Sequence, residues 1–185
     1  MRENEFDLAA GEYSVQIKTD ETVRGLDPLG LDSFMVQELP KLNKKRNIWE
    51  IINKVRQVTS SSGLFKIFSV NDALAATRDL GIIAASLAKH SIDLASVPAL
   101  EQSLIELSNR TGEVPRDTVF SYGPRNPQGD RMRTFTGTKE EKKFITSFVD
   151  GMKPLSSCIQ HLMATLEVSI LDGLFQKEPH LLWKK

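Results

Sequence analysis

Cysteine is nearly absent from this sequence of 185 residues. The single Cys158 cannot form a disulfide within the chain, and it excludes a zinc site built from several cysteines. Long apolar runs are also missing, since no stretch approaches the ~20 residues of a membrane-spanning helix, and the first residues contain no signal-peptide segment. We therefore expect a cytoplasmic protein with no membrane partner.

An excess of charge of either sign is missing too, because 24 basic residues balance 24 acidic ones. This balance removes any overall attraction to the phosphates of nucleic acid, so we expect no nucleic-acid partner. Hydrophobic residues make up 40% of the chain and charged residues 26%, as in ordinary globular proteins. The length suits one domain with a buried core.

Common enzyme motifs are also absent. The sequence has no GxGxxG, P-loop, HExxH or GxSxG motif. Its three histidines, His90, His161 and His180, are too far apart for two of them to lie on adjacent turns of one helix. We interpret each as structural or solvent-exposed rather than as a metal ligand.

Apolar residues at helical spacing are abundant, and they predict an all-α fold, a helical bundle. Asp27 with Pro28 is a typical helix start, Pro40 is expected to end that helix, and Gly112 suits a left-handed helix cap. Helices are predicted over residues 27–39, 47–58, 71–90, 98–110 and 138–174. The predicted division is a polar arm (1–25), a single helical domain (26–175) and a tail (176–185).

Two of these helices have distinctive faces. The predicted helix 71–90 has a small-residue side that would let a helix backbone or a flat ligand come close, and helix packing is the favoured interpretation. The predicted helix 138–174 has a sustained apolar face and opens with Thr138 and Glu141 as a capping box. The polar loop 126–137 before it is expected to lie on the surface or to close over something.

Residues 115–127, PRDTVFSYGPRNP, are unusually dense in proline and aromatic residues. Together with other segments they resemble the monodechloroaminopyrrolnitrin synthase family. These are haem enzymes of pyrrolnitrin biosynthesis that rearrange chlorotryptophan, and they belong to the tryptophan and indoleamine dioxygenase superfamily. The resembling segments, in order, are LDPLGLDSFMVQELPKLNKKRNI (26–48), ALAATRDLGIIAASLAKH (73–90), VPALEQSLIELSNRTGEVPRDTVFSYGPRNP (97–127) and the arginine-rich FTG loop (131–137).

The resemblance implies a dioxygenase-like fold in which helices enclose a haem, with tryptophan or another indole-containing molecule as substrate. It also implies oxidoreductase chemistry in secondary metabolism. Phe120, Ser121, Tyr122 and Arg125 are the substrate-binding candidates, because aromatic rings stack on an indole, hydroxyls form hydrogen bonds and a guanidinium pairs with a carboxylate. The other interpretation makes Phe120 a core residue, Tyr122 a turn residue and Arg125 a surface residue.

Members of the family are about twice as long as this chain, and the histidine that binds the haem iron lies in their second half. The resemblance is therefore to the N-terminal half, and no catalytic or metal-binding residue is assigned. Three interpretations stay open: a short natural form, half of an enzyme completed by a second chain, or a fragment that forms a homo-oligomer. The alternative function is a non-catalytic module that associates through the apolar face of residues 138–174.

Overall fold

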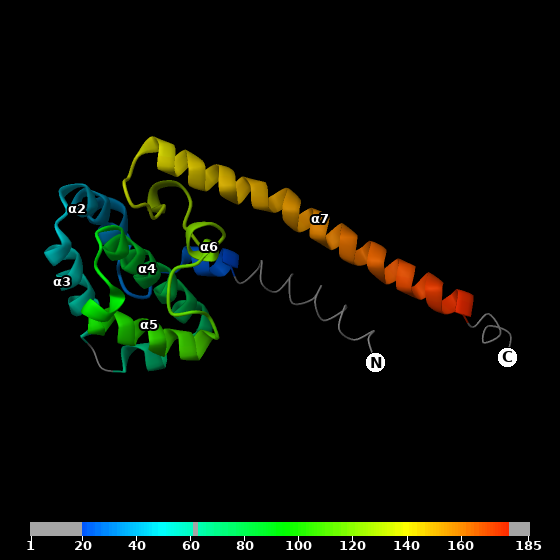
Figure 1. Ribbon diagram of the computed structural model, residues 1–185, viewed down its shortest axis with the longest axis horizontal. Coiled ribbons are helices and arrows are strands. Elements are labelled where there is room, and N and C mark those ends of the chain that lie inside the picture. Colours follow the sequence, from blue (N-terminus) through cyan, green and yellow to red (C-terminus); the bar gives the residue numbers. More distant parts are fainter. Residues whose placement is uncertain (1–19, 61–62, 178–185) are drawn as a thin grey trace. The chain divides into compact units, whose positions relative to one another are not determined.

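The computed structural model describes residues 20–60 and 63–177, and within these ranges the chain is helical and contains no strand. The predicted all-α fold is therefore confirmed. The chain divides into two units, residues 17–149 and residues 1–16 with 150–185. The elements, shown in Figure 1, are η1 (Phe34–Glu38), α2 (Leu39–Lys45), α3 (Ile48–Thr59), η2 (Leu64–Ile67), α4 (Val70–Lys89), η3 (Leu94–Ser96), α5 (Pro98–Thr111), α6 (Val119–Tyr122), η4 (Gly129–Arg131) and α7 (Lys139–Lys177).

The packed part of the chain begins before the residue expected. Residues 20–25, assigned to the polar arm, form a helical turn in which Val23 is fully buried. Val23 packs in a small apolar cluster with Leu74 and Ala75 of α4. Residues 1–19 of the arm lie outside the described residues, and the other domain boundaries stay predictions.

Pro40 does not end the helix that it was predicted to end. The Asp27 carboxylate caps the preceding turn by accepting hydrogen bonds from the backbone N–H groups of Leu31 and Asp32. The π-helical turn η1 follows, and the Leu39 N–H donates to the Phe34 carbonyl. Pro40 then lies in the first turn of α2, where a missing N–H is tolerated.

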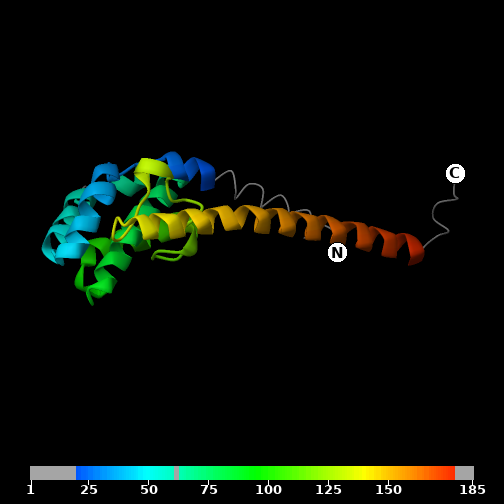
Figure 2. The same ribbon diagram turned by 90° about the horizontal axis from the view of Figure 1, so that it is seen from above.

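Three of the predicted helices form the centre of the fold. The predicted helices 47–58, 71–90 and 98–110 are observed as α3, α4 and α5, with ends within a residue or two. Gly112 caps α5 with φ of 74°, as predicted. Both views show α2 to α5 gathered into one group (Figure 1 and Figure 2). Their buried side chains, among them Ile51, Leu80 and Leu104, form one apolar core.

The loop 126–137 is exposed at residues 128–130 and 136–137, as predicted, but residues 126–127 and 132–134 are buried, which corrects the prediction for these parts. Asn126 and Arg133 have no exposed surface. Arg133 forms ion pairs with Asp79 of α4 and with Asp32, and Arg131 also pairs with Asp32. Because these guanidinium groups meet buried or half-buried carboxylates, the two arginines anchor the loop to the folded interior.

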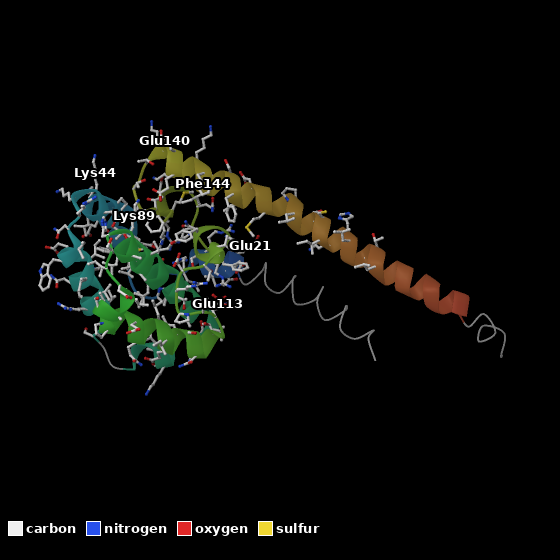
Figure 3. All side chains as sticks on the ribbon, in the orientation of Figure 1. Glu21, Lys44, Lys89, Glu113, Glu140 and Phe144 are labelled. Atoms are coloured by element: carbon white, nitrogen blue, oxygen red, sulfur yellow. The ribbon has the colours of Figure 1, made fainter. Side chains whose placement is uncertain are left out.

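Helix α7 extends across the boundary between the two units. Thr138 Oγ1 accepts a hydrogen bond from the Glu141 N–H, as expected for a capping box, but the Glu141 carboxylate binds the backbone of Phe135 and Thr136 instead of Thr138. Within residues 17–149, Ile145 of α7 is buried, whereas Phe144 is 71% exposed and projects from the helix (Figure 3). In the described ranges no helix has both the length and the apolarity to cross a membrane.

Candidate functional site

On the small-residue side of α4, Ala73 and Ala76 lie in the core shared with α3 and α5, and Gly81 receives the backbone of the 116–117 segment. A Cβ at Gly81 would lie 2.9 Å from the backbone nitrogen of Asp117 and 3.2 Å from the carbonyl carbon of Arg116. Only glycine lets the 116–117 segment cross α4 this closely. The close packing predicted for this face therefore involves Gly81, and the alanines that follow it along α4 remain open to a surface pocket.

This surface pocket, called the α4 pocket below, has a volume of about 460 Å³. Ala84, Ala85 and Ala88 line it from α4, residues 91–94 line it from the next turn, and Arg116 with Asp117 completes it. Its volume lies within the ~300–1,000 Å³ typical of small-molecule sites. The pocket thus combines an apolar surface of small side chains with charged groups from two segments.

Tyr122 is the predicted site residue that reaches this pocket, through Asp117. The Tyr122 hydroxyl donates a hydrogen bond to Asp117 Oδ2 at 2.7 Å. The Tyr122 ring packs on Phe135 with 5.4 Å between centroids, and Lys89, labelled in Figure 3, lies over the other ring of this pair. Burial and the hydrogen bond to Asp117 raise the pKa of Tyr122, so this hydroxyl stays a proton donor at neutral pH.

Asn126 holds the tyrosine in place from the side of the loop. Its amide group donates to the carbonyls of Tyr122 and Arg133, and its Oδ1 accepts from the Arg133 N–H at 2.9 Å. These three bonds tie the end of α6 to the segment that leads to Phe135. Because Asn126 is fully buried, its bonds are shielded from water and fix the relative positions of Tyr122 and Phe135.

None of the four predicted site residues lines the α4 pocket. Ser121 is buried and its Oγ accepts a hydrogen bond from the Thr118 N–H. Arg125 is 3% exposed and forms ion pairs with Asp20 and Glu113, with its guanidinium over the Phe120 ring. Arg125 is therefore not at the surface, and its charge is already paired within the chain.

Arg116 and Asp117 were not among the site residues predicted from the sequence, although both stand in the stretch PRDTVFSYGPRNP. Gly81 is the residue from which a nearby site segment could have been predicted, because it lies among small residues in the middle of a predicted helix. A glycine at such a position indicates a close backbone approach. The sequence does not reveal which segment makes that approach.

The described histidines do not fit a haem bound in the α4 pocket. His90 Nε2 lies 3.1 Å from Asn43 Oδ1, which also accepts a hydrogen bond from Ser86. His161 is exposed on α7 with Nδ1 2.7 Å from the Ser157 carbonyl, and neither histidine lines the pocket. Among the described residues no group of His, Cys, Asp and Glu side chains could hold a metal ion. His180 lies outside the described residues.

Comparison with known protein families gives a match over most of the chain. The model of the family described as monodechloroaminopyrrolnitrin synthase PrnB matches residues 19–180. The matched range contains every residue that lines the α4 pocket, and it begins next to the first described helical turn.

Proposed function

This chain belongs to the monodechloroaminopyrrolnitrin synthase family, and we propose that it forms the substrate-binding side of a haem-dependent enzyme that modifies tryptophan in secondary metabolism. The observation that supports this role is the α4 pocket, in which alanines face charged groups of the 116–117 segment. An indole-containing amino acid has both an apolar ring system and charged groups, so it suits such a lining.

The haem iron would take its protein ligand from residues beyond those described, in this chain or in a second one. His90 is engaged with Asn43, and His161 lies on the exposed side of α7. The α4 pocket is therefore assigned to the substrate, and the described residues carry no step at the iron. We place the enzyme in the cytoplasm, where an exposed free thiol such as Cys158 stays reduced.

The experiment that tests this function is calorimetric titration of the purified chain with L-tryptophan. Replacing Ala88, an exposed residue of the pocket lining, by leucine fills the pocket with little effect on the core. We expect Ala88→Leu to weaken tryptophan binding at least tenfold. The same change at Ala164, exposed on α7, is the matched control and should leave binding unchanged. Equal affinities for all three proteins would contradict the proposal.

A second candidate function is self-association through α7. Leu155, Leu162 and Leu166 are 57%, 59% and 47% exposed. Their spacing of seven and four residues places them on one face of the helix, as in the seam of a coiled coil. The partner proposed for this face is a second copy of the chain, since an apolar seam of this kind is complementary to itself.

Light scattering after gel filtration tests the self-association. The chain is expected to elute as a dimer at micromolar concentration, and Leu162→Glu is expected to make it a monomer because a charge in the seam opposes burial. Gln160, exposed on the same helix, provides the control Gln160→Glu. A monomeric chain at all concentrations would contradict this second role.

A further inference from the structure

The Asp117 carboxylate is held in a fixed place at the wall of the α4 pocket. Its backbone rests on Gly81, and its Oδ2 accepts a hydrogen bond from Tyr122. Tyr122 is itself fixed by Phe135 and Asn126. The second carboxylate oxygen, Oδ1, has no hydrogen-bond donor among the described residues. Asp117 therefore brings a preorganised acceptor to the pocket.

Arg116 brings the opposite charge to the same pocket. It is exposed, and it has no carboxylate partner in the described ranges. The three buried arginines differ in this respect, since Arg78, Arg125 and Arg133 all form ion pairs within the chain. Arg116 is therefore available to a ligand, and its planar guanidinium suits a carboxylate.

We infer that the α4 pocket recognises its substrate as a zwitterionic amino acid, with Asp117 accepting hydrogen bonds from the ammonium group and Arg116 donating hydrogen bonds to the carboxylate. Tyr122 is the positioning residue that orients Asp117, and the apolar side chain of the ligand lies on the alanines of α4. This inference rests on the proposed function, because it assigns the polar contacts of the same site. The sequence suggested Arg125 as the partner of the substrate carboxylate, whereas this inference assigns that role to Arg116.

The test compares three ligands that differ by one charged group. L-Tryptophan has both groups, tryptamine lacks the carboxylate, and indole-3-propionate lacks the ammonium. Calorimetry with Asp117→Asn is expected to show roughly tenfold or greater weakening for tryptophan and tryptamine, because a hydrogen bond to a charged group contributes about that factor. Indole-3-propionate should bind as before. Arg116→Gln should give the converse pattern, weakening tryptophan and indole-3-propionate only.

Two further variants complete the design. Asp130→Asn makes the same change of charge at an exposed residue of η4 and should alter none of the three affinities. Tyr122→Phe keeps the ring and removes the hydroxyl, so it should weaken the two ammonium ligands and spare indole-3-propionate, a selectivity that general loosening of the fold would not produce.

The outcomes separate the inference from the function on which it rests. If tryptophan binds and Ala88→Leu blocks it, but Asp117→Asn weakens all three ligands equally or none, the assignment of Asp117 is overturned and the pocket stands. If the unmodified chain binds none of the three ligands, both the pocket's function and the inference are overturned.

Discussion

Gly81→Ala tests whether the approach of the 116–117 segment to α4 builds the site. Alanine is favoured over glycine inside a helix by about 0.5–1 kcal/mol. At Gly81, however, the added Cβ would lie 2.9 Å from a backbone nitrogen and 3.0 Å from a Cα, atoms that cannot rotate away as a side chain can. Overpacking of this kind costs about 1–3 kcal/mol. The net expectation is a loss of about 1 kcal/mol of unfolding free energy.

Thermal unfolding followed by circular dichroism measures this loss, and Gly151→Ala is the control. Gly151 lies inside α7, and a Cβ there would meet no atom within 4 Å. That substitution should therefore stabilise its helix by about 0.5–1 kcal/mol. Gly81→Ala should also weaken tryptophan binding, because the 116–117 segment must move. If both variants gained stability equally, the close approach at Gly81 would be refuted.

Three further predictions concern buried and half-buried charges. Asp79→Ala removes the carboxylate that the buried guanidinium groups of Arg78 and Arg133 share, and it leaves Arg78 with backbone carbonyls alone. This change should lower the free energy of unfolding in urea by about 3–5 kcal/mol, whereas Asp130→Ala at the surface should have little effect. Burial alone would raise the pKa of Asp32, but its two arginine partners lower it below its ordinary value. Its contribution to stability is therefore present above about pH 4 and lost as the pH falls further, and Asp32→Asn should remove that part of the acid dependence. The raised pKa of Tyr122 favours the neutral hydroxyl in the folded state. The contribution of Tyr122 to stability is therefore present below about pH 10 and lost at higher pH. In a pH titration followed by tyrosinate absorbance, Tyr122→Phe should remove the step that occurs above the ordinary tyrosine range.

Each of these expectations has a contrary result. A loss below about 1 kcal/mol for Asp79→Ala would mean that the buried pairs are dispensable. If Asp32→Asn lost stability at acidic pH in the same way as the unmodified chain, the ion pairs of Asp32 would not persist in solution. Ionisation of all tyrosines near pH 10 before unfolding would contradict the hydrogen bond from Tyr122 to Asp117.

The helices of the core were predictable because local rules decide them. The apolar stripe of α5 and the left-handed Gly112 both act within a few residues of the helix that they define. Pro40 was misjudged because a π-helical turn precedes it, and that turn depends on how residues 34–38 pack against the core.

The loop and the pocket depend on contacts between segments far apart in the sequence. The burial of Arg133 requires Asp79, and these residues are separated by 54 positions. From the sequence alone, a polar loop is predicted to be exposed unless the carboxylate that pairs with its arginine is known. In the same way, Tyr122 was predicted as a site residue, but Arg116 and Asp117, which line the pocket, became apparent only from the close approach to Gly81.

The central claim, that the α4 pocket holds an indole-containing amino acid, is tested most directly by two-dimensional ¹H–¹⁵N NMR of the labelled chain titrated with L-tryptophan. Saturable shifts of the amide signals of Ala84, Ala88, Leu94 and Asp117, with signals of α3 unchanged, are the predicted result. Shifts confined to other regions, or no saturable shift at millimolar tryptophan, would contradict the claim.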